Sequence, residues 1–452
     1  MNRELAREII ACLRLSGSPK DRLNRLSSFT WDEWRRTLQW LDESGLALPF
    51  WQRMHEQGTE ALLPKELSTA LRRNMQDHRR RIRAMAEDVD SIHQAFDEAG
   101  IKYALLKGFA MIPEYCPVAS ARTTYDYDYL VAVSCLREAE RALEEIGYRS
   151  QPPVAGQPSV YFHEARPPRS PLSRDDLYSA GFPRTLELHS APWNPEELKI
   201  PLDLSANWLA RRKTRTLSME QLDMERSQRI RSGLRFSVLS EEDELLFQLL
   251  HAFRHILQDW CRLASLFDIA WFVEHRTGDT AFWQRFLDQV EPCPALRQIS
   301  GVALALSERL FGATLARTVA AETIERLPVP IALWLLRYGY RSAVDNFSDN
   351  KFSLLLYREF VRDASAWRAI QRRRLLPLHR PNRAAYTSSR AAGDRLAAKW
   401  SQSVYVARRL KHHALGAVRY GLEWLRWRHV RAATARHPQG RFGRGGGTFT
   451  LE

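Results

Sequence analysis

One stretch of the chain, residues 101–131, constrains its possible folds more than any other. Its first apolar run, residues 103–106 (YALL), predicts a short buried strand. Lys107-Gly108 follows and predicts the end of that strand and the start of a short helix, since glycine lets the backbone turn or approach a ligand closely. A second run, residues 125–131 (YDYDYLV), alternates aromatic and acidic residues and predicts another strand.

The second strand carries two carboxylates on one face. Side chains two residues apart leave a strand on the same side, so Asp126 and Asp128 point the same way. Two carboxylates on one face repel each other unless a cation lies between them, and Mg²⁺ prefers such oxygen ligands. The alternative is a solvated edge strand, with Tyr and Leu in the core and both acids in water. A bare Asp-x-Asp pair does not decide between the two.

The surrounding residues favour the cation site through a family resemblance. A strand ending in Leu-Lys-Gly at residues 106–108, a short helix, Arg122 and then Asp-x-Asp-x-Leu-Val at residues 126–131 resemble the core motif of the DNA polymerase β-like nucleotidyltransferases. More narrowly, they resemble a bacterial branch with the pattern LLKG…R…DxDxLV. The resemblance extends over residues 30–275. It implies an α+β fold, in which a small mixed-sheet, polymerase β-like core is flanked by N-terminal and C-terminal helical modules.

A third carboxylate follows further along the chain. Residues 184–189 (RTLELH) alternate, which predicts a strand with Leu186 and Leu188 toward the core and Glu187 and His189 on the other face. In the resembled family a later strand supplies an acid in this acid-x-His pattern. The resemblance therefore implies that Glu187 is the third metal-site carboxylate. The alternative is an exposed strand glutamate.

The resemblance implies two-metal chemistry at these acids. Asp126 and Asp128 would hold two Mg²⁺ ions, roughly 3.5–4 Å apart, and the triphosphate bound to them. Glu187 would bind the metal at the nucleophile and help to remove its proton. The enzyme would move a nucleoside monophosphate from an NTP, with ATP favoured, to a hydroxyl-type acceptor. Enzymes of the resembled branch act in natural-product or polysaccharide biosynthesis, so a small molecule or a peptide is the expected acceptor.

The same reasoning assigns the phosphate contacts. Gly108 would allow the backbone to approach the β- and γ-phosphates, and the N-terminus of the following helix would add its dipole. Lys107 or Arg122 would neutralise charge that develops on the phosphates. The wider superfamily has Gly-Gly or Gly-Ser at this turn, whereas this chain has Lys107-Gly108-Phe109 and so lacks the serine hydroxyl. No metal ligand is lost by that departure.

Helices are predicted before residue 100. Thr30 and Glu33 form a capping-box pattern, which predicts a helix that ends near Gly45. A longer helix is predicted from Pro64 to Gly100, because apolar residues recur there at helical spacing. The arginines at residues 79–81 are predicted to form a solvated face of that helix, and a phosphate-facing patch is the alternative.

The middle of the chain mixes helices and one long connection. Residues 135–146 predict a helix, and residues 148–181, rich in Pro, Ser and Arg, predict an irregular and often functional connection. Residues 200–350 are predicted to be helical. His251 and His255 lie four apart on one helix, which suits a metal, but position 252 is Ala, so the Glu of the zinc-protease motif is missing. Packing or hydrogen bonding is the preferred interpretation of this pair.

The C-terminal region is strongly basic. Residues 361–452 carry 20 Lys and Arg against four acids, a net charge of +16. The preceding 360 residues sum to −2, which gives the chain its net charge of +14. Residues 371–382 predict a linker and residues 440–447 a disordered Gly/Arg-rich end. One long helix is predicted between them, from an apolar stripe among its basic residues: Leu396, Trp400, Val404, Ala407, Leu415, Val418, Leu422 and Leu425.

Three interpretations of this basic tail are possible. The stripe would pack onto the helical module, or the basic surface would capture a polyanion such as RNA, or the helix would lie on an anionic membrane. The corresponding alternatives to an enzyme are a non-catalytic RNA-binding or regulatory protein on the same fold and a peripheral membrane-docked protein.

Length and composition set the remaining expectations. With 452 residues the chain can form two or three domains. The charged N-terminus does not resemble a secretory signal, and five scattered cysteines without a Cys-x-x-Cys pair favour a reducing cytoplasm. The predicted parts are an N-terminal helical region at 1–100, a nucleotidyltransferase core at 101–235, a helical domain at 236–360 and a basic, Arg/Trp-rich helical tail at 361–452.

Overall fold

The computed structural model divides the chain into two compact units. The first contains residues 1–197 and 204–247, and the second contains residues 198–203 and 248–452. Each unit is described here by itself, and the four-part division expected from the sequence stays a prediction. The structure describes residues 1–16, 25–151, 159–166, 172–173, 176–202, 204, 208–224, 230, 233–345, 350–376, 386–387, 395–435, 442–445 and 448–451.

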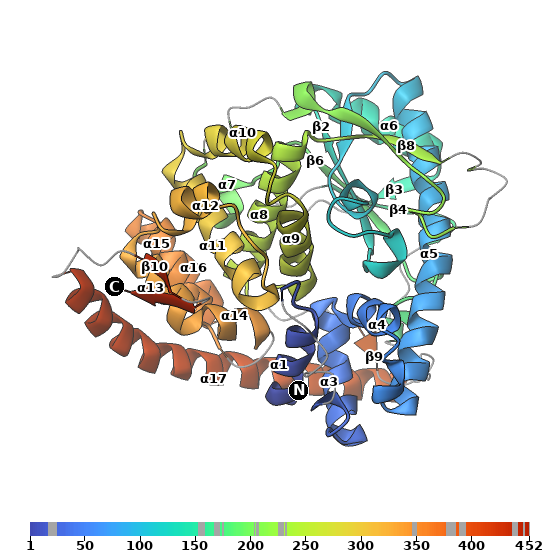
Figure 1. Cartoon of the computed structure of the whole chain (residues 1–452). Helices are drawn as coiled ribbons and strands as arrows, with labels where there is room; N and C mark the ends of the chain where they lie inside the picture. Colours follow the sequence, from blue (N-terminus) through green and yellow to red (C-terminus); the bar gives the residue numbers. More distant parts are fainter. Residues whose placement is uncertain are drawn as a thin grey trace. The chain divides into compact units, whose positions relative to one another are not determined.

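The first unit begins with helices, as the sequence predicts (Figure 1). The capping box is confirmed, since Thr30 Oγ1 accepts from the Glu33 amide at 3.4 Å and Glu33 Oε2 accepts from the Thr30 amide at 2.9 Å. Gly45 ends this helix with a φ of +75°. The elements here are α1 (Arg3–Cys12), α3 (Trp31–Ser44), α4 (Ala47–Glu56), the 3₁₀ helix η1 (Glu60–Leu62) and α5 (Lys65–Glu98).

The long helix α5 presents its apolar stripe to the core of the first unit. Its buried residues repeat at three or four positions, as expected for one face of a helix. This stripe packs beside the central sheet and against α6 (Figure 1). The apolar members of the stripe predicted by the sequence are all buried: Leu71, Met75, Ile82, Met85, Val89, Ile92 and Phe96.

The central sheet is mixed and has seven strands in the order β3-β4-β6-β2-β1-β8-β7. The predicted α+β fold is therefore confirmed. Between the strands lie short helices, namely η2 (Gly108–Met111), η3 (Ala119–Ala121), η4 (Val133–Cys135), α6 (Leu136–Glu145), α7 (Pro195–Leu198) and η6 (Trp208–Arg211). The strands are β1 (Tyr103–Leu105), β2 (Asp126–Val131), β3 (Tyr148–Ser150), β4 (Ser159–His163), β6 (Thr185–His189), β7 (Lys213–Leu217) and β8 (Leu234–Val238); β5 spans Leu172–Ser173.

Two stretches differ from the sequence-based expectation. The connection at residues 148–181 contains the strands β3 and β4, which extend the sheet beyond β6. The prolines at positions 152, 153, 167, 168 and 171 surround β4 and hide its short apolar pattern. The region predicted as helical from residue 200 likewise contains β7 and β8 before α8 begins. Both strand pairs form through contacts with the rest of the sheet, which no local pattern records.

The described residues of the second unit are mostly helical. The helix α11 lies at its core, with twelve of its 18 residues buried. Its helices are α8 (Glu241–Leu257, shared with the first unit), α9 (Leu263–His275), α10 (Thr280–Val290), α11 (Pro294–Phe311), α12 (Arg317–Val319), α13 (Val329–Trp334), α14 (Tyr340–Val344), α15 (Ser353–Phe360), α16 (Ala364–Leu375) and α17 (Arg395–Ala435), with π-helical turns η7 (Ala320–Ile324) and η8 (Leu335–Gly339). β9 spans Tyr386–Thr387, and β10 (Phe442–Gly445) pairs antiparallel with β11 (Thr448–Leu451).

The basic region corrects three further expectations. Residues 371–374, predicted to be linker, belong to α16. The apolar stripe predicted in α17 does not pack as a whole, because five of its residues are exposed: Trp400, Leu415, Val418, Leu422 and Leu425. Tyr420 and Trp427 are buried instead. The predicted disorder at residues 440–447 is wrong for residues 442–445, which form β10 and pair with β11. The rest of that stretch lies outside the described residues. No helix of the described residues is long and apolar enough to cross a membrane.

Candidate active site

The pairing of β2 with β6 brings two predicted carboxylates together. These strands are parallel, and Asp128 lies directly opposite Glu187 in the register. Directly opposed residues on one face of a sheet are neighbours at about 5 Å. His189 follows two residues later on the same face. Asp128, Glu187 and His189 form a group whose potential ligand atoms all lie within 4.8 Å of one another.

The opposite face of the same strands packs into the core. Tyr127 and Tyr129 alternate with the acids and are buried. Tyr127 Oη donates to Asp88 at 2.7 Å, and Tyr129 Oη lies 3.0 Å from His93 Nε2, both partners being on α5. The alternation predicted from the sequence is therefore confirmed, and it separates a polar face from an apolar one.

Lys107 completes the group from the end of β1. β1 and β2 pair antiparallel, and the Leu106 amide donates to Asp128 O at 2.9 Å. Lys107 follows Leu106 directly, so its side chain can reach Asp128. Lys107 Nζ lies 2.9 Å from Asp128 Oδ1. His189 Nε2 donates to the same oxygen at 3.0 Å and lies 3.5 Å from Glu187 Oε2.

The charges in this group stabilise one another. Burial opposes ionisation of Asp128, but Lys107 and His189 outweigh it and lower the pKa of this carboxyl. Burial would likewise lower the pKa of Lys107, yet Asp128 and Asp126 outweigh it, so the pKa of Lys107 is raised. The pKa of His189 is also raised, because its hydrogen bonds to Asp128 and Glu187 exceed the effect of burial. The carboxylate and the ammonium therefore both stay charged.

One oxygen of the group remains available for a cation. Asp128 Oδ2 is buried and has no hydrogen-bond partner among the described residues. A buried charged oxygen without a partner is costly, and a metal ion would satisfy it. Asp126 is half-buried two residues earlier on the same strand face, and its charge acts on Lys107. The structure brings together two carboxylates, Asp128 and Glu187, and one imidazole, His189, and does not include Asp126 in this group. Such a donor set fits a divalent cation.

The predicted phosphate turn follows Lys107. Gly108 has a φ of +63°, a conformation that favours glycine, and a Cβ there would lie 3.1 Å from Thr124 Cγ2. The helix after it, η2, is a single 3₁₀ turn of four residues, so it offers less of a dipole than the sequence suggested. Arg122, the other predicted cation, lies in the loop before β2, with its guanidinium 3.5 Å from Thr124 Oγ1.

Sequence reasoning missed the pair that supports this turn from behind. Arg215 on β7 donates to Ala110 O and, at 3.3 Å, to Ile112 O. Glu244 on α8 accepts from Arg215 at 3.2 Å. Burial raises the pKa of Glu244 to about 7, although Arg215 acts against that shift. Arg215, held by buried Glu244, therefore fixes the backbone that follows the predicted phosphate turn.

Sequence reasoning also misplaced Arg81. The prediction of a solvated arginine face is wrong for this residue, which is fully buried. Its guanidinium donates to Tyr125 O and to Ser179 O, each at 3.3 Å, and lies over the rings of Tyr125 and Phe182 at 5.2 and 4.9 Å. Arg81 therefore fixes the backbone one residue before Asp126.

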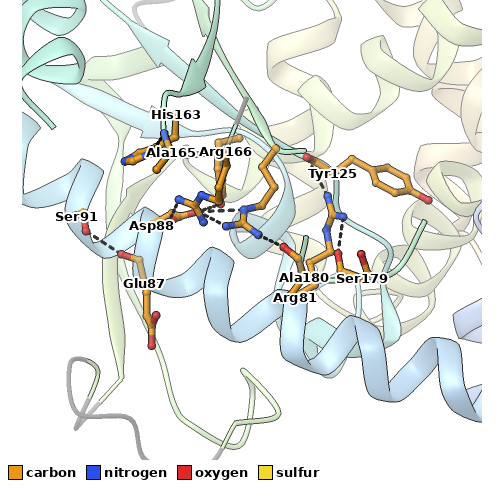
Figure 2. A network of polar contacts seen from close by, with 12 residues as sticks. Arg81, Glu87, Asp88, Ser91, Tyr125, His163, Ala165, Arg166, Ser179 and Ala180 are labelled. Carbon is orange, nitrogen blue, oxygen red and sulfur yellow. Dashed lines mark hydrogen bonds and ion pairs between the residues drawn. The ribbon is translucent and has the colours of Figure 1, made fainter. Parts of the chain in front are cut away.

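A second polar hub on α5 fixes the two strands that carry the acids. Asp88 accepts from an Arg166 guanidinium nitrogen at 2.6 Å (Figure 2). It also accepts from Arg184 Nε at 3.0 Å. It also accepts from Tyr127 Oη on β2. Arg184 immediately precedes β6, so one half-buried carboxylate connects α5 to both strands. Arg81 and Asp88 position β2 through the backbone of Tyr125 and the side chain of Tyr127.

A histidine fixes the loop that carries Arg122. His78 Nδ1 donates to Ser120 O at 3.0 Å, and the Thr124 amide donates to His78 Nε2 at 3.4 Å. Burial and the charge of Arg81 lower the pKa of His78 to about 3, so the ring is neutral. The loop from residue 120 to residue 124 is therefore held against α5 at both ends.

The histidine pair on α8 belongs to no metal group of the described residues. The rings of His251 and His255 make an edge-to-face contact with centroids 4.3 Å apart. The group of potential metal ligands found in the described part of the chain is the one around Asp128. The sequence-based preference for a packing role is in keeping with this ring contact.

The structure places Asp128, Glu187 and His189 together on a mixed sheet, beside a glycine turn that follows β1. This arrangement agrees with the nucleotidyltransferase resemblance of the sequence. Comparison with known proteins agrees: a model of the family described as "uncharacterised nucleotidyltransferase" matches residues 31–312. The chain belongs to this family, and it is a nucleotidyltransferase enzyme that uses a nucleoside triphosphate. A search of curated proteins and a search of solved structures found no match.

Proposed function

We propose that the protein is a Mg²⁺-dependent enzyme of the LLKG…R…DxDxLV branch, which moves a nucleoside monophosphate from an NTP to a hydroxyl-type acceptor. The unsatisfied Oδ2 of buried Asp128, opposite Glu187 in the sheet, is the observation that carries the proposal. ATP is the first donor to test. A small molecule or a peptide of a natural-product or polysaccharide pathway is the proposed acceptor, and the cytoplasm is the proposed location.

Three carboxylates would hold two Mg²⁺ ions in this proposal. Asp126 and Asp128 would contact both ions, and Glu187 would contact the ion at the attacking oxygen. When bound, the ions would polarise the α-phosphate, activate the acceptor hydroxyl and stabilise the leaving pyrophosphate. The carboxylate of Asp128 needs no proton loss to bind them, because its pKa is already lowered.

The other site residues act on the triphosphate. Lys107 keeps its proton, since its pKa is raised, and its ammonium lies at the edge of the carboxylate group. The positive φ of Gly108 turns the backbone there without a side chain in the way. Lys107 and Arg122 would neutralise charge on the β- and γ-phosphates, and Gly108 would allow their approach. His189 would orient Asp128 and Glu187 by hydrogen bonds.

Nucleotide binding provides the first test. Wild-type protein should gain thermal stability from at least one of the four NTPs in Mg²⁺, and no stability from the same NTP in EDTA. Asp126→Asn should lose this gain, and Asp32→Asn, an exposed acid on α3, should keep it. If NTP stabilises the protein equally with and without Mg²⁺, or if no NTP binds while RNA does, the non-catalytic RNA-binding alternative replaces this proposal.

A further inference from the structure

The helix α17 packs onto its unit through one face. Tyr420 and Trp427, seven residues apart, are buried. Tyr338 Oη donates to Glu423 Oε2 at 2.8 Å, and the ring of Tyr338 lies 5.8 Å from that of Trp427. Residues 420, 423 and 427 share one side of a helix, so this side is the packed one.

The opposite side of α17 carries an exposed apolar stripe. Trp400 and half-buried Val404 form its first part, and Leu415, Val418, Leu422 and Leu425, spaced three or four residues apart, form its second part. The exposed Lys411 lies on the same side of the helix between the two parts. The exposed apolar members are residues that the sequence alone offered as candidates for packing, and that alternative is wrong for them. The exposed fractions are Trp400 73%, Leu415 37%, Val418 62%, Leu422 57% and Leu425 53%.

Cations line both edges of this stripe. At about 100° per residue, Arg408, Arg419 and Arg426 lie roughly 80–100° to one side of the line through Trp400 and Val418. Lys399 and Arg428 lie as far to the other side of that line. All five are exposed. The helix holds nine Lys and Arg and one acid, Glu423, whose Oε2 accepts from Tyr338 and whose Oε1 accepts from Arg426 at 2.7 Å. Arg426 is thus paired within the helix.

We propose that this face of α17 lies on the surface of an anionic lipid bilayer. Long basic side chains at the edges of an apolar stripe can reach lipid phosphates while the stripe enters the boundary of the acyl chains. The helix would lie in the plane of the membrane, since it is not apolar enough to cross one. From Trp400 to Leu425 the stripe is about 38 Å long at 1.5 Å per residue.

Two other occupants fit this face less well. A second copy of the helix would bring arginines against arginines along both edges, and the exposed face offers no acid to pair with them. RNA would cover a stripe centre of Val and Leu, which gives its phosphates no hydrogen bonds and its bases no stacking platform other than Trp400. The helix also lies outside residues 31–312, so membrane docking is independent of the proposed catalytic site.

Vesicle binding tests the proposal. Full-length protein should co-sediment with vesicles of phosphatidylcholine and phosphatidylglycerol, and this binding should weaken with added salt and with pure phosphatidylcholine. Leu422→Gln/Leu425→Gln should weaken it about tenfold or more, because two apolar side chains would no longer enter the lipid. Arg419→Gln/Arg428→Gln should weaken it on anionic vesicles. Leu376→Gln, equally exposed but outside α17, should bind as wild type.

Three results would overturn the proposal. The first is vesicle binding that Leu422→Gln/Leu425→Gln leaves unchanged. The second is binding of single-stranded RNA that the arginine variant abolishes, without binding to anionic vesicles. The third is a dimer of the wild-type protein that Leu422→Gln/Leu425→Gln converts to a monomer, again without vesicle binding. Because all these side chains are exposed, each variant should melt like the wild type, so misfolding does not obscure the outcome.

Discussion

Lys107 Nζ and Asp128 Oδ1 lie 2.9 Å apart at the centre of the site. The contact joins the end of β1 to the middle of β2, and it occupies the same carboxylate oxygen that accepts from His189. In the protein without metal, the chain's own cation therefore stabilises a carboxylate proposed as a metal ligand. A bound metal and Lys107 would compete for the negative charge of Asp128.

This competition gives the first prediction. Lys107→Met should raise the affinity for Mg²⁺ in the absence of nucleotide, because the ammonium no longer neutralises Asp128. The same variant should bind the triphosphate more weakly, about tenfold or more, because a charge-assisted contact to phosphate is lost. Isothermal calorimetry measures both affinities. Lys102→Met, exposed five residues earlier, is the control, and a fall in both affinities in Lys107→Met would argue against the competition.

The second prediction separates Glu187 from His189. Carboxylate oxygens suit Mg²⁺, whereas imidazole suits softer metals. Glu187→Gln should therefore lose most Mg²⁺-dependent transfer, and His189→Ala should keep a reduced activity because it loses only hydrogen bonds that orient two carboxylates. Turnover at saturating Mg²⁺ is the measurement. An inactive His189→Ala beside an active Glu187→Gln would show that the imidazole is the essential ligand.

The third prediction concerns Arg81, which acts through the backbone of Tyr125. Arg81→Met should lower the free energy of unfolding by about 2–4 kcal/mol, because two buried carbonyl oxygens lose their donor and two rings lose a cation. Arg79→Met, on the same arginine run but half-exposed and paired with Asp223, should change it by less than about 1 kcal/mol. Urea unfolding gives both values, and equal losses in the two variants would contradict the buried role of Arg81.

The fourth prediction follows from Glu244. Its pKa is raised from an ordinary 4.5 to about 7 in the folded protein, so the folded state holds this proton more tightly than the unfolded chain does. The resulting stabilisation is present below about pH 4.5 and is lost as the pH rises toward 7, at most about 3 kcal/mol. Glu244→Gln should therefore flatten the decline of the melting temperature between pH 5 and pH 8.

The control for Glu244 lies on the same helix. Glu241→Gln removes a more exposed acid near Lys213 and should keep the wild-type decline. A Glu244→Gln variant that follows the wild-type curve across this range would show that Glu244 does not titrate there. Triphosphate binding is the second measurement on Glu244→Gln. It should be retained, because the side-chain amide oxygen of the new glutamine can still accept from Arg215.

Much of the polar face could be predicted from alternation alone. The pattern of residues 126–131 fixes which side chains leave β2 together, and the pattern of residues 184–189 does the same for β6. Their register could not be predicted, because a parallel pairing of strands more than fifty residues apart depends on the whole sheet. The contact of Lys107 with Asp128 depends on the antiparallel pairing of β1 with β2. The sequence alone did not predict that contact.

Arg81 shows where a usable signal was overlooked. It lies three residues after His78 and four before Met85, both on the buried side of α5. Helical spacing therefore predicts that Arg81 points toward the core, whereas the run of three arginines at residues 79–81 suggested a face exposed to solvent. In α17 the sequence found the apolar stripe and could not tell that Tyr420 and Trp427, on the other side, make the packed face.

The most direct test of the central claim follows the α-phosphate of the donor. NTP labelled at the α-phosphorus should transfer its label, in Mg²⁺, to an acceptor in a cell extract, and NTP labelled at the γ-phosphorus should transfer none. Asp126→Asn and Asp128→Asn should transfer no label; Asp128→Asn should also be less stable, by roughly 3 kcal/mol, because Lys107 loses its buried partner. Transfer of the γ-label, or full transfer of the α-label by folded Asp126→Asn, would contradict nucleotidyl transfer at this site.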